Sequence, residues 1–388
     1  MSKFRFSCAL LSRHLNYRCL SHCDVERTRI ICNVLPSLCT PFTREHATIS
    51  QKEDGGSSTV SKRGLRAVDL AKKLRYEKEK QTDAQVPVSP LQRRVSELRR
   101  FSKQLQSVHP NVLAKALYRG LVFQNQNLVV INKPYGVPVY DAPGIRNSIV
   151  GVMPVLAKIV AGMRTGSQLH VCHALDKETT GILLLARSEE IADNVQRLFK
   201  AHQVERKYWA VTVGVPVPSE GVIDIPIIER EVVGPQPHFK MGLSPAFKVS
   251  GEGDDVIRVR SHRQAQAAVT QYRVLDSSGS CSLVELQLVT GIKHQLRVHM
   301  AHALGCPILG DHKYAHWTKL APQKLPEGVL GRLGLEQSKA RYVPLHLHAR
   351  QLTVPGFKGQ PEITVSCPLP KFFTTSLHRL KISLPDKS

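Results

Sequence analysis

The chain has 388 residues, of which 42% are hydrophobic, so it can build a sizeable core as one large domain with extensions or as two or three domains. Its 54 Lys and Arg against 31 Asp and Glu give a formal net charge of +23, and the simplest partner for such a surface is a polyanion. The nine cysteines include no Cys-x-x-Cys pair, which argues against a disulfide framework or zinc site, and no apolar run reaches the roughly 18 residues of a membrane span.

Residues 1–45 have the composition of a mitochondrial targeting segment, rich in Ser, Leu, Phe and Cys. Four basic residues precede the first acidic one, Asp24: they are Lys3, Arg5, Arg13 and Arg18. An unstructured basic tail is the alternative interpretation. Residues 46–62, which contain the polar run QKEDGGSS, are typical of a flexible linker.

Residues 63–116 predict a basic helical extension. The stretch 65–81 has a helix-forming composition, and a second helix is indicated by Ser89 as N-cap with Pro90 at the first helical position. Its apolar residues recur at steps of three and four: Leu91, Val95, Leu98, Phe101 and Leu105. The opposite face is basic: Arg93, Arg94, Arg99, Arg100 and Lys103. That face predicts either contact with a nucleic acid or a solvated surface.

Residues 117–380 predict the main domain. Short apolar or alternating runs indicate strands at 128–132, 206–213, 269–276, 282–290 and 345–354. Helices are expected at 189–200 and from 291 to about 304, with Gly305 ending the second. The basic stretch 229–263 is rich in Pro and Gly, which favours a loosely ordered surface loop; an arm that grips a nucleic acid is the alternative.

Asp176 lies in the nonamer HALDKETTG at 173–181, between an apolar residue and a turn that leads into a strand. An Asp at such a place usually bonds to nearby backbone N–H groups within the turn. The pattern alone therefore favours a structural role.

The nonamer resembles the catalytic motif of the RluA family of RNA pseudouridine synthases, usually His-Arg-Leu-Asp-x-x-Thr-Ser-Gly. Three further stretches resemble family motifs in the same order: VINKPYGV at 130–137, RKYWA at 206–210 and TGIKHQLRVH at 290–299. Together they cover roughly residues 120–370, and GDHKY at 310–314 is a further loop of the family type. On this resemblance, residues 117–380 form the catalytic domain.

The resemblance implies an α+β fold built on a mixed, largely antiparallel sheet. It implies that Asp176 is the catalytic nucleophile, that Tyr208 lies against the target base and that Arg297 pairs with Asp176. An enclosed carboxylate needs such a partner to stay ionised. The residues of the same motifs expected to contact RNA are Lys133, His173, Lys177, Lys207, Lys293, His294 and Gln295.

The resemblance implies no cofactor and no metal, and the sequence contains no Gly-rich nucleotide-binding motif and no zinc-type spacing. His346 and His348 alternate on one strand without a Cys or acid at ligand spacing, which argues against a metal site there. The predicted partner is RNA, and mitochondrial RNA-processing or ribosome-assembly proteins are the further partners considered.

Two positions depart from the family pattern: Ala174 and Ile292 stand where arginines are usual. The leading hypothesis is a synthase of the mitochondrial matrix that modifies ribosomal, transfer or messenger RNA. A catalytically inactive RNA-binding or ribosome-assembly factor that retains the fold is the rival. A nucleic-acid-binding protein of another compartment is the third possibility.

Overall fold

The computed structural model describes residues 5–6, 89–162, 166–233, 237–245, 247–249, 256–258, 262–357, 359 and 361–385. The predicted linker and the predicted helix 65–81 lie outside these residues, as does the predicted targeting segment apart from β1 (Arg5–Phe6). The described chain from Ser89 onward belongs to one unit with a continuous set of contacts. The domain limits given above stay predictions.

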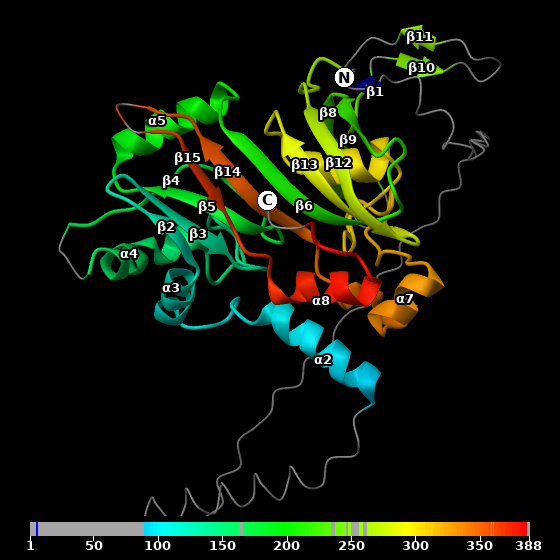
Figure 1. Ribbon diagram of the computed structural model, residues 1–388, viewed down its shortest axis with the longest axis horizontal. Coiled ribbons are helices and arrows are strands. Elements are labelled where there is room, and N and C mark those ends of the chain that lie inside the picture. Colours follow the sequence, from blue (N-terminus) through cyan, green and yellow to red (C-terminus); the bar gives the residue numbers. More distant parts are fainter. Residues whose placement is uncertain are drawn as a thin grey trace, which may run out of the picture. The chain divides into compact units, whose positions relative to one another are not determined.

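Among the described residues, eleven strands form one sheet in the order β1-β7-β12-β13-β6-β14-β5-β3-β2, with β15 paired to β14 and β4 to β5 (Figure 1). Only β1–β7 and β14–β5 are parallel pairs, which confirms the predicted α+β fold on a mixed, largely antiparallel sheet. The strands beyond β1 are β2 (Leu121–Gln124), β3 (Leu128–Lys133), β4 (His170–Val171), β5 (Thr180–Ala186), β6 (Glu205–Val213), β7 (Glu220–Asp224), β12 (Val269–Ser278), β13 (Cys281–Leu288), β14 (Leu347–Val354) and β15 (Ile363–Ser366).

The centre of the sheet brings together segments that are far apart in the sequence. Strand β14 lies between β5 and β6, so that Ala349 pairs with Gly181 on one side and with Tyr208 on the other. Gly181 has φ 109°, and a Cβ there would lie 2.3 Å from the carbonyl oxygen of Ala349. Only glycine allows this close parallel approach. The register therefore sets the start of β5 level with Tyr208.

The two faces of the sheet are covered by different helices. Side chains alternate along β6, so Tyr208 and Ala210 join one core while Val211 joins another. The first core also contains buried residues of α3 (Pro110–Arg119), α4 (Ile149–Val160) and α5 (Glu189–Lys200). The second contains those of α2 (Pro90–Lys103), α7 (Glu327–Leu333) and α8 (Lys371–Leu380). Among the described residues no helix is long and apolar enough to cross a membrane.

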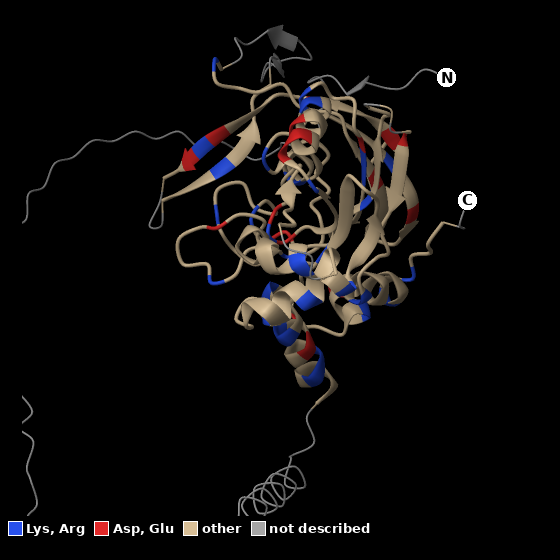
Figure 2. Ribbon diagram, turned by 90° about the vertical axis from the view of Figure 1, so that its left-hand side faces the viewer, with Lys and Arg blue, Asp and Glu red and all other residues tan. Residues whose placement is uncertain are grey.

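Helix α2 begins where the sequence predicts. The Ser89 hydroxyl accepts a hydrogen bond from the Gln92 backbone N–H, and the Gln92 side chain accepts one from the Ser89 N–H. Leu98 is buried in the second core, with Leu91, Val95 and Phe101 packed against it. The opposite face exposes Arg93, Arg99, Arg100 and Lys103, and basic residues of α2 appear blue in Figure 2.

The predicted surface loop at 229–263 is corrected by the structure, which has two hairpins there. Strands β8 (Ile227–Val232) and β9 (His238–Leu243) pair antiparallel, as do β10 (Phe247–Val249) and β11 (Val256–Arg258). The first hairpin is ordered by tertiary contacts: Ile227, Ile228, Met241 and Leu243 are buried. The density of Pro, Gly and charge hid this pattern in the sequence.

The segment after β13 is helical as predicted, but it is not a regular α-helix. A short α6 (Gln295–Val298) continues into a π-helix, η2 (His299–Ala303). A π-helix widens the turn by one residue and is often found at functional sites. The 3₁₀ helix η3 (Gln337–Tyr342) follows later in the chain.

Candidate active site

Asp176 lies on the loop that enters β5, and the backbone of this loop is held from the β3 side. The carbonyl oxygen of Lys177 accepts hydrogen bonds from the Gly136 N–H, at 3.0 Å, and from Lys133 Nζ, at 3.0 Å. Lys133 is fully buried, and its second bond goes to the Pro134 carbonyl. The Thr179 N–H closes a turn onto the Asp176 carbonyl. The local turn is therefore present, and the carboxylate is left to face other elements.

Two cavities meet at Asp176. The larger has a volume of about 800 Å³ and contains Asp176, Tyr208 and Arg297 in its wall. The smaller, of about 590 Å³, shares Asp176, His294 and Arg297 and adds Lys177, Lys313 and Arg341. The three residues predicted to be catalytic thus line one cavity, and most charged residues of the second are basic.

The carboxyl group of Asp176 is enclosed, although its side chain keeps 31% of its surface exposed. Burial raises the pKa of Asp176 above its ordinary value, and the positive charges of Arg297 and Lys133 oppose that shift. Arg297 Nη1 lies 3.9 Å from Asp176 Oδ2, and His294 Nε2 lies 3.7 Å from the same oxygen. The group is a partly desolvated carboxylate with cationic and imidazole neighbours.

Tyr208 projects from β6 into the larger cavity and is almost fully buried. Burial raises the pKa of its phenol, and the negative charge of Asp176 adds to the shift against the opposing charge of Arg206. The phenol therefore stays protonated at neutral pH. Its ring offers a flat surface against which a planar base can stack.

Arg297 makes its hydrogen bonds to Asp311, a residue that the sequence analysis left without a role. Arg297 Nε and Nη2 donate to the two carboxylate oxygens of Asp311, both at 2.8 Å, and Glu178 lies 3.6 Å from Nη2. Burial alone would lower the pKa of Arg297, but Asp311, Glu178 and Asp176 together raise it above its ordinary value. Arg297 is thus a fixed cation that faces Asp176 from a position set by Asp311. The motif GDHKY at 310–314 was the available signal.

His294 is placed beside Asp176 rather than on an outer surface. Its Nδ1 lies 2.6 Å from the hydroxyl of Tyr314, whose ring also lies under the guanidinium of Arg297 at 5.2 Å. Burial, together with the charges of Arg297 and Lys313, lowers the pKa of His294 to about 3. The imidazole is therefore neutral at physiological pH.

Three other residues predicted to contact RNA line the larger cavity, but they also bond within the protein. His173 Nε2 accepts a hydrogen bond from the Leu184 N–H at 3.1 Å, and burial lowers its pKa to about 4. The buried Gln295 amide bonds to the backbone of Val269 and Ile292. Lys293 forms an exposed ion pair of 2.9 Å with Glu229. Their proposed RNA contacts stay predictions.

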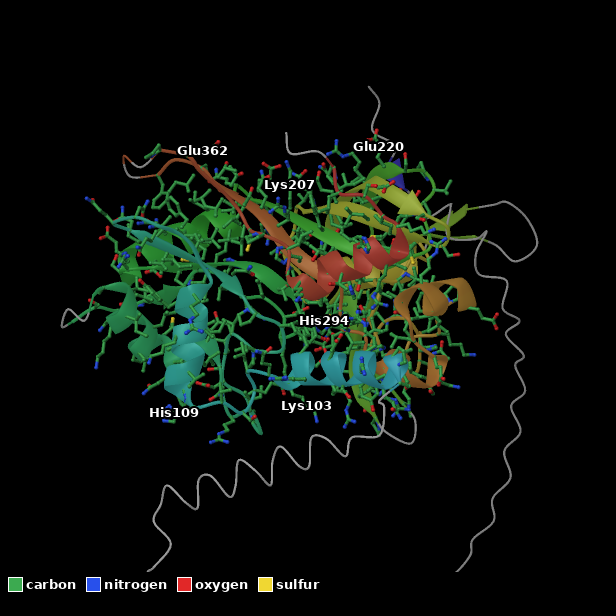
Figure 3. The ribbon with its side chains drawn as sticks, turned by 60° about the horizontal axis from the view of Figure 1, so that its bottom comes forward. Lys103, His109, Lys207, Glu220, His294 and Glu362 are labelled. Carbon is green, nitrogen blue, oxygen red and sulfur yellow. The ribbon has the colours of Figure 1, made fainter. Side chains whose placement is uncertain are left out.

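Lys207 is not brought to Asp176. It pairs with Glu205 at 3.1 Å and lines a separate hollow of about 290 Å³ together with Glu220 and Tyr272. Figure 3 labels Lys207 and Glu220 near each other and away from His294. Lys207 and Tyr208 point to opposite faces of β6, since consecutive residues of a strand alternate.

The positions that depart from the family pattern both border the larger cavity. Ala174 and Ile292 line it together with Arg206, whose guanidinium lies over the ring of Phe199. The His346 ring bonds to the carbonyl oxygen of Pro344, and the His348 ring bonds to the hydroxyl of Thr180, so both rings are engaged within the protein. Within the described ranges no group of three or more His, Cys, Asp or Glu is arranged to hold a metal.

Residues 127–302, which include Asp176, Tyr208 and Arg297, match the model of a family described as RNA pseudouridylate synthase. The chain belongs to this family of isomerases, whose members act on RNA, and the predicted family is confirmed.

Individual relatives are similar over most of their length. The chain is 64% identical to the zebrafish (Danio rerio) pseudouridylate synthase RPUSD4, mitochondrial, over 89% of this chain and 96% of the relative. It is 33% identical to the mouse mitochondrial mRNA pseudouridine synthase Rpusd3, over 70% and 80%. The solved structure of human RNA pseudouridylate synthase domain containing 4 superposes with a TM-score of 0.64 at 54% identity, covering 71% of this chain and 98% of that one.

Proposed function

We propose that this chain converts specific uridines of mitochondrial RNA to pseudouridine, with Asp176 as the reacting carboxylate. The observation that carries the proposal is the placement of Asp176, Tyr208 and Arg297 in the wall of one cavity of about 800 Å³. These residues come from three distant parts of the sequence. An Asp with only a structural role in a turn would need neither Tyr208 nor Arg297 beside it.

The reaction breaks the bond between N1 of uracil and C1′ of ribose and forms a bond between C5 and C1′. The proton on C5 is lost and N1 gains one, so no cofactor and no redox step is needed. Asp176 attacks or electrostatically assists C1′, as carboxylates do in other glycosyl chemistry. Tyr208 stacks on the uracil, which must leave the RNA stack to reach the cavity. Arg297 keeps Asp176 ionised against the effect of burial.

The RNA contacts are supported by charge. The chain carries a formal net charge of +23, and Lys177, Lys313 and Arg341 line the smaller cavity next to Asp176. Lysine and arginine contacts to phosphates give strong, salt-dependent and sequence-independent affinity. We propose that these residues hold the RNA backbone beside the extruded uridine, in addition to the motif residues that line the same two cavities.

The mitochondrial matrix as location rests on two supports. Relatives carry mitochondrial names, and residues 1–45 have a basic, acid-poor composition. The proposed substrates are ribosomal, transfer or messenger RNA of the organelle; one relative is named for mRNA. A reporter fused to residues 1–45 should enter mitochondria, and a fusion that stays in the cytosol would contradict the location.

The test of the activity is pseudouridine mapping of mitochondrial RNA in cells with the intact protein, without it, or with Asp176→Asn only. The proposal expects the same sites to vanish in both altered lines, which also identifies the substrates. The matched control is Asp193→Asn, an exposed aspartate on α5, which should leave every site in place. If the sites persist in both lines while ribosome assembly fails only without the protein, the rival scaffold role is correct.

A further inference from the structure

A chain of hydrogen bonds runs from strand β9 to the carboxylate of Asp176. The backbone N–H of Met241 donates to the Tyr314 hydroxyl oxygen at 3.3 Å, and that hydroxyl lies 2.6 Å from His294 Nδ1. The other ring nitrogen, Nε2, lies 3.7 Å from Asp176 Oδ2. Each of these contacts joins two different segments of the polypeptide.

The first bond favours one direction for the second. An N–H can only donate, so the Tyr314 oxygen accepts from Met241 and its own proton is available for His294 Nδ1. If Nδ1 carried a proton instead, the Tyr314 proton would need another acceptor, and the described residues provide none. This arrangement favours the form of His294 that carries its proton on Nε2, the nitrogen that faces Asp176.

The β9 end of this hydrogen-bond series is held in place by a buried lysine. Lys240, which precedes Met241, donates from Nζ to the carbonyl oxygens of His316 and Lys319 at 2.9 and 2.8 Å. Its side chain is almost completely buried. Strand β9 is thereby tied to the loop that follows Tyr314, which holds the Met241 N–H against the Tyr314 hydroxyl.

The backbone of His294 shows that this placement has an energetic cost. His294 has φ 57° and ψ 16°, in the left-handed region that residues other than glycine seldom adopt. Its side chain does not cap α6, so helix capping does not account for the conformation. Strained residues of this kind persist where the surrounding structure holds them, and they cluster at active sites.

We propose that His294 is a positioning residue for the isomerisation: held by Tyr314 in its Nε2–H form, it donates toward Asp176 Oδ2 and keeps that carboxylate ionised and oriented at the substrate sugar. The inference rests on the proposed role of Asp176. The gap of 3.7 Å is long for a hydrogen bond, and such bonds commonly tighten when the substrate is bound. In this form His294 has no lone pair facing the cavity, so it acts as a donor and not as a base.

The charges around the pair favour the same arrangement. Burial, with Arg297, Lys313 and Lys293, lowers the pKa of His294 to about 3, so an imidazolium is not formed in the working range. The titratable and charged groups that face Asp176 or His294 are Lys133 on β3, Lys177 and Glu178 on the Asp176 loop, Tyr208 on β6, Glu229 on β8, Lys293 and Arg297 next to His294, and Asp311, Lys313 and Tyr314 on the following loop.

The variants that test the proposal are His294→Ala, which removes the donor, and His294→Gln, whose amide can donate from the position of Nε2. The assay is single-turnover pseudouridine formation at saturating RNA over a range of pH, with the Kd for RNA measured separately. Because hydrogen bonds to charged groups are worth about 1.5–3 kcal/mol, His294→Ala should slow the reaction by about tenfold or more, with the Kd unchanged.

The pH profile separates positioning from a merely structural role. Loss of the donor destabilises the carboxylate form of Asp176, so the acid limb of the rate profile should move to higher pH in His294→Ala and return in His294→Gln. Tyr314→Phe, which keeps the ring over Arg297, should move it in the same direction. An acid limb that stays at the wild-type position in His294→Ala overturns the proposal, as does a His294→Gln variant as slow as His294→Ala.

A measurement on the unaltered protein guards against misfolded variants. Nitrogen NMR of histidine-labelled protein, with the His294 signal assigned by its loss in His294→Gln, should show a bare Nδ1 and a protonated Nε2 from pH 5 to 8. A protonated Nδ1 or a titration in that range overturns the proposal. Asp176→Asn distinguishes the two levels: if it stays active the proposed function itself is wrong, whereas an inactive Asp176→Asn with a wild-type limb in His294→Ala removes only the role of His294.

Discussion

Arg297 and Asp311 form a bidentate ion pair in which both donor–acceptor distances are 2.8 Å. Both side chains are buried, and Asp176 lies at 3.9 Å from the third guanidinium nitrogen without sharing in the two short bonds. The position of Arg297 is thus set by a residue outside the reaction. In the proposed reaction, Asp176 can therefore change its charge while the arginine that faces it stays in place.

Asp311→Asn should destabilise the fold by about 3 kcal/mol at neutral pH, because removing one partner leaves a buried charge uncompensated. Burial raises the pKa of Asp311, but the charge and hydrogen bonds of Arg297 bring it below its ordinary value. The pair therefore stabilises the protein above a pH of roughly 4, and this contribution is lost as the pH falls through the folded-state pKa. Urea unfolding from pH 3 to 7 should show the two proteins converging at low pH. A constant difference at every pH would contradict the ion pair as its source.

Lys133→Met should change how stability depends on alkaline pH. Burial lowers the pKa of Lys133 to about 7, so the folded protein releases its proton there while the unfolded chain holds it up to a pH of roughly 10.4. Between these values the wild-type protein should gain up to about 1.4 kcal/mol of stability per pH unit, a gain that Lys133→Met lacks. Denaturant unfolding at pH 7, 8 and 9 measures it. Parallel curves for both proteins would show that Lys133 is charged when folded. Lys158→Met, on α4, is the control.

Gly310→Ala should prevent the loop before Asp311 from forming. Gly310 has φ 82°, and a Cβ there would lie 2.1 Å from the carbonyl oxygen of Pro344. Backbone atoms must move, so we expect a loss of about 3 kcal/mol or more and of activity. In Gly328→Ala, within α7, the added Cβ meets nothing within 4 Å. That change should stabilise by about 0.5–1 kcal/mol. Thermal unfolding of the two variants measures both changes in stability. A Gly310→Ala protein as stable as wild type would show that the close approach of position 310 to the Pro344 carbonyl oxygen is wrong.

Lys313→Ala should weaken RNA binding about equally for all sequences, since Lys313 lines the smaller cavity as a cation suited to phosphate. The slope of log K against log salt concentration should fall by about 1. The matched variant is Lys207→Ala, because Lys207 lies in a separate hollow and pairs with Glu205. Filter binding at several salt concentrations measures both. An equal effect of the two changes would show that RNA covers the β6 face that carries Lys207.

Local patterns predicted much of the fold. Ser89 and Pro90 gave the start of α2 because capping is decided by neighbouring residues, and α5 has the predicted limits 189–200. The alternating runs became β6, β12 and β13, although their ends shifted by one or two residues. The β8–β9 hairpin was missed because its order comes from buried contacts such as those of Lys240, which a basic, Pro-rich stretch does not reveal.

The candidate site was predictable only where a motif marks a residue. Asp176 and Tyr208 reach one cavity because β14 aligns β5 with β6, a pairing that no local pattern encodes, and Arg297 joins them from α6. Asp311 and Tyr314 were missed for the same reason, since their partners are 14 and 20 residues away in the sequence. Lys207 shows that a residue within a motif need not reach the cavity. Its neighbour Tyr208 lines the cavity, whereas Lys207 points to the other face because side chains alternate along the strand.

The place of β14 between β5 and β6 has a consequence for the time at which the protein becomes active. Asp176 and Tyr208 are aligned through this strand, Leu347–Val354, which the ribosome makes after all three motif residues. A nascent chain that already contains all three motif residues still lacks the strand that unites them. We therefore expect the protein to become active only after β14 has been made, and fragments that end before β14 to be inactive on uridine even though they keep many of the basic residues that attract RNA.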